Sequence, residues 1–212
     1  MKNNHGSEFG PTHGRPITTD CLFEINKRFM GGGMSQNYAA LYIFEHYLQL
    51  HDFDEVIEIG SQKGALSLFF ANMAAVTERF RFSTFEINLC CWYNRPGEGV
   101  GHWFDKLQKL CPEHIQMHNM DCFSDEAAKL VQELIKRGKT LIFCDGGNKV
   151  KEFKHFVPMI KPGDRLMVHD WEHEIWMNDL VETMQQHNIV VDSPFDKYCT
   201  ILKTWLMPFV KL

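Results

Sequence analysis

A strand, a glycine turn and a helix follow one another directly between residues 55 and 70. The apolar run 55–59 predicts a buried strand, and the apolar residues from Ala65 to Phe70 predict the helix that follows. Gly60 and Gly64 allow the backbone between them to bend sharply and to approach a ligand without a side chain in the way. The exposed N–H groups at the start of the helix then offer a site for an anion.

Glu58 stands two residues before the first of these glycines, close to the end of the predicted strand. A carboxylate there would repel a pyrophosphate, whereas it would attract a cationic group. Together with the anion site at the helix start, it predicts a cofactor that carries both an ammonium and a carboxylate, as S-adenosylmethionine does. The candidate cofactor-binding residues of this turn are Glu58, Gly60, Ser61, Gln62 and Gly64.

Apolar runs alternate with helical patterns along most of the chain. The runs predict strands at 55–59, 81–86, 115–119, 140–144 and 165–169, and the helical spacing predicts helices at 35–50, 65–78, 103–110, 125–137, 149–160 and 173–187. This alternation predicts an α/β fold with a Rossmann-like, doubly wound, mostly parallel sheet covered on both faces. Near the C-terminus, 189–191 and 198–206 predict two strands joined through a turn at Pro194 without a helix, which makes an antiparallel hairpin at the sheet edge.

The length of 212 residues suits a single domain with a substantial core. Residues 1–16 are polar and rich in Gly, Asn, His and Pro, so we expect a mobile N-terminal arm over 1–34. A single S-adenosylmethionine-binding domain would then span 35–212, with Ser35 as the N-cap of its first helix.

Composition and charge argue against several classes of protein. No apolar run approaches the length of a membrane span, and the first residues have no apolar core of the kind that a signal peptide needs. The seven cysteines include no C-x-x-C pair, so they predict neither a zinc site nor a disulfide scaffold, and a cytoplasmic protein is expected. The net charge of −5 without a basic block does not favour nucleic acid as a partner, and the oligomeric state stays open.

Carboxylates stand at the ends of all five predicted parallel strands. They are Glu58, Glu86, Asp121, Asp145 and Asp170. A single acid after a strand is commonly a turn former or a helix cap. Because ligands of a doubly wound sheet bind outside the carboxyl ends of its strands, five acids in register indicate a ligand site instead.

The second and third strand ends suit a nucleoside. Glu86, followed by Ile87, lies about 20 residues after the glycine turn, where a carboxylate can accept both hydroxyls of a ribose. Asp121-Cys122-Phe123 supplies an acid for an adenine amino group and an aromatic ring to pack on the base.

Asp145 and Asp170 lie at the ends of neighbouring strands beyond the cofactor. Two such carboxylates can hold a hard cation such as Mg²⁺, which would lower the pKa of a substrate hydroxyl. Alternatively, Asp145 contacts only the cofactor ammonium, and Asp170 caps a helix that starts near Glu172. Lys149 and His169 lie beside this pair, and either is a candidate for the base that takes a hydroxyl proton.

These residues resemble those of class I S-adenosylmethionine-dependent methyltransferases, over about residues 34–206. More narrowly, the chain resembles the cephalosporin-hydroxylase-like and macrocin-type O-methyltransferases. That group shows a Glu-x-Gly-x-x-x-Gly turn, an Asp-Gly pair and a Lys-Pro-Gly-Asp before a strand ending His-Asp. The matching segments here are Glu58 to Gly64, Asp145-Gly146 and Lys161 to Asp170.

The resemblance also implies roles for particular residues. Gln36, in the segment Met34-Ser35-Gln36, would contact the cofactor, and similarity to catechol-type methyltransferases implies that Asp145 and Asp170 bind a metal. The expected activity is transfer of a methyl group from S-adenosylmethionine to a hydroxyl of a small molecule, with or without Mg²⁺.

Two other functions remain as alternatives. Such families often place a His or Lys where this chain has Asn148, which favours a module that binds S-adenosylmethionine without catalysing a reaction. A nicotinamide-dependent oxidoreductase would need glycines spaced G-x-G-x-x-G, and the Gly60 to Gly64 turn does not supply them.

Overall fold

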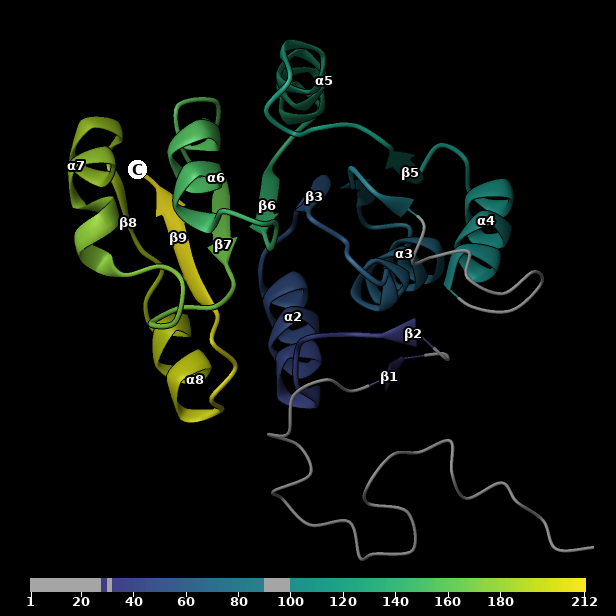
Figure 1. Cartoon of the computed structure of the whole chain (residues 1–212), viewed down its shortest axis with the longest axis horizontal. Coiled ribbons are helices and arrows are strands. Elements are labelled where there is room, and N and C mark those ends of the chain that lie inside the picture. Colours follow the sequence, from purple (N-terminus) through teal and green to yellow (C-terminus); the bar gives the residue numbers. More distant parts are fainter. Residues whose placement is uncertain (1–27, 30–31, 90–99) are drawn as a thin grey trace, which may run out of the picture.

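A seven-stranded sheet in the order β5-β4-β3-β6-β7-β9-β8 forms the centre of the molecule (Figure 1). The computed structural model describes residues 28–29, 32–89 and 100–212. The strands are β3 (Glu55–Ile59), β4 (Arg81–Phe85), β5 (Ile115–His118), β6 (Thr140–Cys144), β7 (Arg165–Val168), β8 (Ile189–Val191) and β9 (Met207–Lys211). Strands β3 to β7 run parallel, and β9 lies antiparallel to both of its neighbours, β7 and β8. The predicted fold class, including the antiparallel hairpin at the C-terminal edge, is confirmed.

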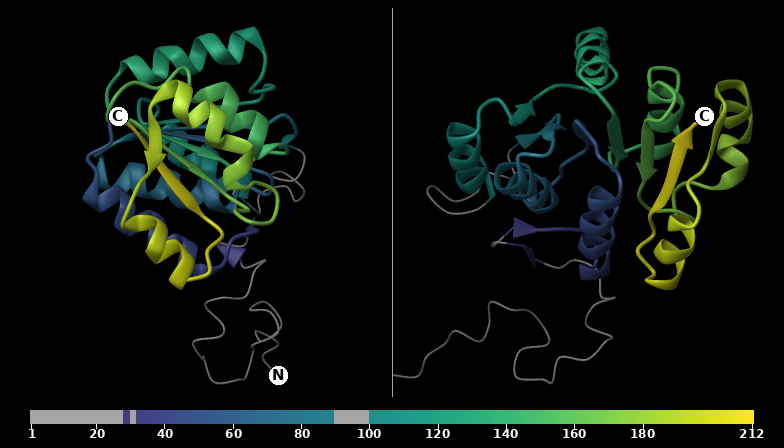
Figure 2. Two further views of the ribbon diagram at one scale, coloured as in Figure 1. Left: turned by 90° about the vertical axis from the view of Figure 1, so that its left-hand side faces the viewer. Right: turned by 180° about the vertical axis from the view of Figure 1, so that it is seen from behind.

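Helices cover both faces of the sheet, as the edge-on view of Figure 2 shows. One face carries α2 (Tyr38–Leu50), α3 (Ala65–Thr77), α4 (Val100–Leu110) and α8 (Phe195–Ile201), and the other carries α5 (Asp125–Lys136), α6 (Lys149–Phe156) and α7 (Met177–His187). Successive residues of a strand point to opposite faces, so Val56 belongs to the first of two buried apolar clusters and Ile57 to the second. The central strands are therefore apolar on both sides, which explains why they appear as continuous apolar runs in the sequence.

A small antiparallel pair precedes α2. It consists of β1 (Arg28–Phe29) and β2 (Gly32–Gly33), and the ring of Phe29 packs edge-on against Phe69 of α3 at 5.9 Å between centroids. Most of the predicted arm 1–34 lies outside the described residues, so its mobility and the domain boundary stay predictions.

Three helix starts differ from the prediction, and one of them is that of α4, which begins at Val100 rather than 103. Asn37, not Ser35, caps α2: its side chain accepts a hydrogen bond from Ala40 N at 2.9 Å, whereas the Ser35 hydroxyl donates to Gln62 Oε1. Helix α7 begins at Met177 rather than 173, because residues 170–175 form turns in which the carbonyl of Asp170 accepts the N–H groups of His173 and Glu174. Asp170 is therefore not the cap of a helix starting near Glu172.

The prediction that 198–206 forms a strand without an intervening helix is wrong. Residues 195–201 form α8, and the second strand of the hairpin is β9, which starts at Met207. Phe195 and Cys199 are four residues apart and both are buried against the α2 side of the core, whereas Ile201 is 70% exposed. This burial has the period of a helix, and it outweighs the strand propensity of the segment.

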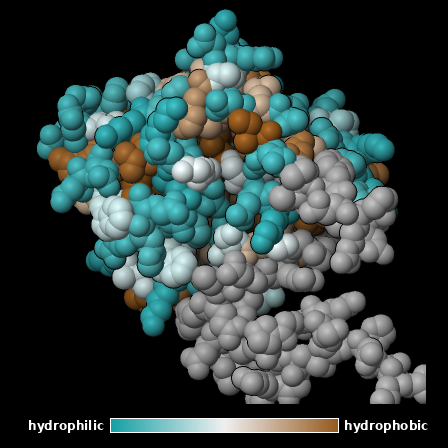
Figure 3. Space-filling view, viewed as in Figure 1, coloured by the Kyte–Doolittle hydropathy of each residue, from teal (hydrophilic) through white to brown (hydrophobic). Residues whose placement is uncertain are grey.

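Among the described residues, no helix combines the length and the apolar character that crossing a membrane requires. On the face seen in Figure 3, hydrophilic side chains predominate and the apolar ones gather in small groups.

A buried carboxylate fastens the turn before β7 to the start of β6. Asp164 is fully buried, and it accepts hydrogen bonds from Thr140 N at 2.8 Å and Lys161 N at 2.9 Å. The ammonium of Lys161 lies 3.0 Å from the same carboxylate. The Lys-Pro-Gly-Asp motif thus aligns two neighbouring strands at the end of the sheet opposite to their carboxyl ends.

We predict that Asp164→Ala destabilises the protein by about 3–5 kcal/mol, because it removes the charged acceptor of the buried Thr140 N–H and of the Lys161 N–H and leaves the Lys161 ammonium only its carbonyl partners Ile135 O and Gly138 O. Urea unfolding followed by circular dichroism measures this change. Asp125→Ala, which removes an exposed carboxylate from the first turn of α5, is the control and should cost at most about 1 kcal/mol. Similar losses in the two variants would contradict this account of Asp164.

Candidate functional site

The order of the sheet reverses between β3 and β6. From β3 the chain adds β4 and β5 on one side, and it then returns to add β6 and β7 on the other. Hydrogen bonds from Gly60 N to Phe85 O, from Asp145 N to Ile59 O and from His169 N to Cys144 O hold the strand ends in register, at 2.9, 2.9 and 3.1 Å. In sheets of this kind the crevice at the reversal binds ligands.

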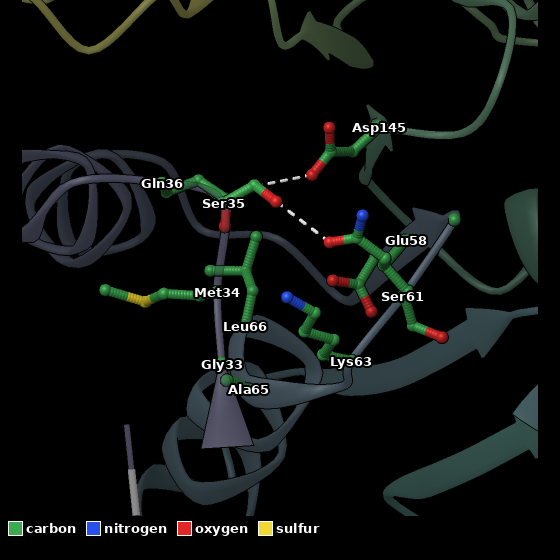
Figure 4. A pocket seen from close by; sticks show the side chains of 12 residues that line it. Gly33, Met34, Ser35, Gln36, Glu58, Ser61, Lys63, Ala65, Leu66 and Asp145 are labelled. Atoms are coloured by element: carbon green, nitrogen blue, oxygen red, sulfur yellow. Dashed lines mark hydrogen bonds between the residues drawn. The ribbon is translucent and has the colours of Figure 1, made fainter. Parts of the chain in front are cut away.

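A cavity with an empty volume of about 220 Å³ lies at this point (Figure 4). Its lining combines the segment after β2, the turn and first residues of α3, and one acid at the end of β6: Gly33, Met34, Ser35, Gln36, Glu58, Gly60, Ser61, Gln62, Lys63, Ala65, Leu66 and Asp145. Six residues predicted to bind the cofactor are among them, namely Gln36, Glu58, Gly60, Ser61, Gln62 and Asp145. The other six, Gly64, Glu86, Ile87, Asp121, Cys122 and Phe123, do not line this cavity.

Position 60 requires glycine. Its φ angle is +85°, and a Cβ atom added there would lie 2.4 Å from Gly146 Cα in the loop after β6. The glycine turn and the Asp145-Gly146 loop are therefore in backbone contact. This contact sets the distance between the acids at the ends of β3 and β6.

Glu58 is a fully buried carboxylate at the floor of the cavity. Its Oε2 accepts hydrogen bonds from Ser67 Oγ and from Thr84 Oγ1, whereas its Oε1 is buried without a partner among the described residues. Burial raises the pKa of Glu58 to about 8, and the two hydroxyl donors oppose that shift only in part. A buried acceptor without a donor is costly, and a cationic ligand would satisfy it.

Lys63 is a lining residue that the sequence analysis missed. Figure 4 shows its amine directed into the cavity, where Glu58 and Ser35 also point. Its chain passes so close to Gly33 that a Cβ atom at that position would lie 2.9 Å from Lys63 Cδ. Lys63 stands one residue before Gly64 in the glycine turn, and this position could have predicted a cation beside the anion site.

Glu86 supports the turn from the end of β4. Its carboxylate accepts hydrogen bonds from Gln62 N at 2.8 Å and from Asn88 N at 2.9 Å. The Ser61 hydroxyl also donates to this carboxylate, at 3.5 Å. A carboxylate has about four acceptor positions, so at least one is still available to a ligand. The following Ile87 is 70% exposed.

The residues after β5 form a separate group near α6. Asp121 Oδ1 accepts a hydrogen bond from Phe123 N at 3.0 Å, and Lys151 Nζ lies 3.7 Å from the centre of the Phe123 ring. Cys122 is partly buried, and burial raises the pKa of its thiol to about 12, so it stays protonated. These side chains are near the sheet edge where an adenine was expected, but they are not joined to the described cavity.

Lys149 begins α6 and is buried between two carboxylates. Its Nζ lies 2.7 Å from Asp170 Oδ2 and 2.9 Å from Glu174 Oε2. Burial alone would lower the pKa of Lys149, but the hydrogen bonds to Asp170 and Glu174 outweigh it and raise the pKa above its ordinary value. The lysine therefore stays charged, and Glu174 is a partner that the sequence did not indicate.

His169, at the end of β7, lies between the two acids proposed as metal ligands. Its Nδ1 is 3.0 Å from Asp145 Oδ1 and 3.2 Å from Asp170 Oδ1. Burial would lower the pKa of His169, but the two carboxylates raise it to about 9. Burial would likewise raise the pKa of Asp170, and His169 with Lys149 holds it well below its usual range.

Glu152 on α6 shapes the loop that carries Asp145. It is buried, and its carboxylate accepts hydrogen bonds from Gly146 N and Asn148 N, both at 3.1 Å. A Cβ atom at Gly146 would lie 2.4 Å from Glu152 Oε1, so a side chain there would displace the carboxylate that holds the loop. Nothing in the sequence pattern distinguished Glu152 from a surface acid.

No protein-family model matches this chain, and no curated protein matches its sequence. Solved structures do match its fold. A structure of CmcI with Mg-SAM has a TM-score of 0.64 at 13% identity, over 86% of this chain and 76% of that one. CmcI with SAH has a TM-score of 0.58 at 12% identity, over 85% of this chain and 80% of that one.

CalS11, a TDP-rhamnose 3'-O-methyltransferase of calicheamicin biosynthesis, was solved without ligand and has a TM-score of 0.53 at 13% identity, over 80% of this chain and 77% of that one. At these identities the likeness is one of fold. The chain shares the fold of CmcI and of the O-methyltransferase CalS11, in agreement with the fold class that the sequence predicted.

We predict that Glu58 makes the stability of the protein depend on pH. Its pKa is about 8 in the folded state and about 4.3 in an unfolded chain, so between these values the folded state holds a proton that the unfolded state has released. The contribution of Glu58 to the free energy of unfolding is therefore present at pH 4 and is lost as the pH rises through 8. Between pH 5 and 8, the free energy of unfolding of the wild type should fall by roughly 2–4 kcal/mol more than that of Glu58→Gln, because the glutamine amide does not ionise.

Urea unfolding at several pH values measures this difference. Glu113→Gln, a change at an exposed acid, serves as the control and should follow the wild type. Parallel pH profiles for the wild type and Glu58→Gln would contradict the raised pKa.

Proposed function

We propose that this protein binds S-adenosylmethionine and transfers its methyl group to a hydroxyl of a small molecule. The observation that carries the proposal is Glu58, a buried carboxylate with one unpartnered oxygen, in a cavity at the sheet reversal of a methyltransferase fold. The buried acceptor fits a ligand ammonium, and the adjacent start of α3 fits a ligand carboxylate.

The cavity matches the amino-acid end of the cofactor. Its lining comes only from the segment after β2, the glycine turn with the start of α3, and the end of β6, so it fits one part of a nucleoside ligand rather than all of it. In the proposed arrangement Glu58 accepts the ammonium, while Lys63 and the first N–H groups of α3 receive the carboxylate. Gln36, Gly60, Ser61, Gln62 and Gly64 would shape this part of the site.

The ribose and adenine would extend from this cavity along the strand ends. Glu86, followed by Ile87, retains an acceptor position for the ribose hydroxyls, and it already holds the backbone of the glycine turn. Asp121, Cys122 and Phe123 would contact the adenine, with the Phe123 ring packed on the base. The Lys151 ammonium now over that ring would then have to move aside.

The reaction requires an aligned acceptor oxygen and a place for its proton. When bound, the cofactor supplies an electrophilic methyl group on a sulfonium. Asp145 and Asp170 are proposed to orient the acceptor, and a metal ion held by them would lower the pKa of its hydroxyl. Lys149 is paired with two carboxylates, so we propose that it positions Asp170 rather than acting as the base.

Two of the similar structures support this class of reaction. CmcI was solved with Mg-SAM, and CalS11 is a 3'-O-methyltransferase that acts on TDP-rhamnose. The proposal for this chain is the same kind of chemistry on a hydroxyl of a small molecule, and the acceptor itself is left open.

One observation favours a second candidate, a module that binds S-adenosylmethionine without catalysis. Both candidate bases, Lys149 and His169, have raised pKa values, and each lies beside two carboxylates. A site without a free base and without a metal would bind the cofactor and leave the acceptor protonated. The nicotinamide alternative has no comparable support.

Calorimetry with S-adenosylmethionine, followed by mass-spectrometric detection of S-adenosylhomocysteine, tests the proposal. We expect micromolar binding and formation of S-adenosylhomocysteine with some members of a panel of sugar and phenolic hydroxyl compounds, each assayed with divalent cations present and absent. Binding without product across the panel would favour the silent module, and absence of binding would refute both.

Glu86→Ala should weaken S-adenosylmethionine binding by about 1–3 kcal/mol, because it removes charge-assisted hydrogen bonds to the ribose and releases the Gln62 N–H. Calorimetric dissociation constants give the size of the effect. Glu113→Ala, at an exposed acid on another loop, is the control. An unchanged dissociation constant for Glu86→Ala would exclude Glu86 from the cofactor site.

A further inference from the structure

Three potential ligand atoms from neighbouring strand ends meet beside the cavity. They belong to Asp145, His169 and Asp170, and all lie within 4.8 Å of one another. Asp145 comes from the end of β6, and the other two come from the end of β7. Asp170 has a positive φ of 56°, so its backbone adopts the left-handed conformation immediately after His169.

The imidazole of His169 is the unexpected member of this group. Its side chain is 2% exposed, and neither ring nitrogen makes a hydrogen bond of good geometry with any part of the chain that the structure describes. The nearest acceptors are the Oδ1 atoms of Asp145 and Asp170, which lie close to Nδ1 but outside the direction of a ring N–H bond. A buried imidazole in this state points to a ligand on Nδ1.

The outer oxygens of both carboxylates are already held. Asp145 Oδ2 accepts a hydrogen bond from Gln36 Nε2, and Asp170 Oδ2 is paired with the Lys149 ammonium. The inner oxygens, both Oδ1, therefore face His169 Nδ1. Metal ligands in proteins are commonly oriented by such outer partners.

The spacing of the three atoms also suits a divalent ion. Two adjacent ligands of an octahedral ion with bonds of about 2.1 Å lie ~3.0 Å apart. His169 Nδ1 is 3.0 Å from Asp145 Oδ1 and 3.2 Å from Asp170 Oδ1. One ion can therefore contact the nitrogen and both oxygens with little movement of the side chains.

We propose that Asp145, His169 and Asp170 form a three-ligand site that selects a borderline divalent ion, such as Co²⁺, Zn²⁺ or Fe²⁺, over Mg²⁺. Imidazole nitrogen suits these transition metals, whereas Mg²⁺ prefers a set made only of oxygens. His169 is the residue that decides the choice. The inference deepens the proposed function, since the ion would lie next to the methyl acceptor, but ion binding can be measured without methyl transfer.

Metal binding to the full chain, stripped of ions with a chelator, tests the proposal. Calorimetry should give a dissociation constant for Co²⁺ at least about tenfold lower than that for Mg²⁺. Electron spin-echo spectroscopy of bound Mn²⁺ should show coupling to a histidine nitrogen in the wild-type protein, which keeps the test independent of any variant.

His169→Asp replaces the nitrogen ligand with an oxygen ligand. It should lower the ratio of Co²⁺ to Mg²⁺ affinity about tenfold or more and abolish the nitrogen coupling. His118→Gln, at a half-buried histidine at the end of β5, is the control and should leave both readouts unchanged. Circular dichroism verifies that both variants are folded.

Equal affinities for Co²⁺ and Mg²⁺, or bound Mn²⁺ without nitrogen coupling, would overturn the proposal. S-adenosylmethionine binding is measured on the same samples without added metal. Cofactor binding with no metal selectivity would remove only the ion site, whereas metal selectivity without cofactor binding would refute the proposed function and leave the ion site standing.

Discussion

The backbone contact between Gly60 and Gly146 is the constraint on which the rest of the site depends. Because Gly60 has no Cβ atom, the turn after β3 and the loop after β6 touch at the point where the sheet order reverses. This contact places Glu58 and Asp145 on one cavity. Glu152 maintains it from α6 by accepting the N–H groups of Gly146 and Asn148.

Around this contact, the acids fall into two kinds of environment. Glu58 is buried and has only hydroxyl donors as partners, so its pKa rises to about 8. Its carboxyl group can therefore accept a cationic ligand. Asp170 is surrounded by His169 and Lys149, which hold its pKa well below the usual range. One edge of the sheet therefore carries an uncompensated acid next to a compensated cluster. This difference suits a cationic cofactor beside a site that handles protons or an ion.

Local patterns identified the fold correctly where the burial was continuous. Strands β3 and β6 are buried along their whole length, and both were predicted, at 55–59 and 140–144, with the observed bounds. Sequence patterns predicted the wrong element where tertiary contacts decided between a helix and a strand. In 198–206, burial of Phe195 and Cys199 selected a helix, and the true strand began only at Met207.

The sequence alone determined the α/β fold, the glycine turn and the row of acids at the strand ends, because the backbone requirements of glycine and the periodicity of burial are local properties. It could not determine which side chains meet across the sheet. Only the tertiary structure placed Lys63 in the cavity, paired Lys149 with Glu174 and put His169 between two aspartates. Lys149 and Glu174, for example, are 25 positions apart in the sequence. The geometry of such contacts depends on strand order and register, which no local pattern contains.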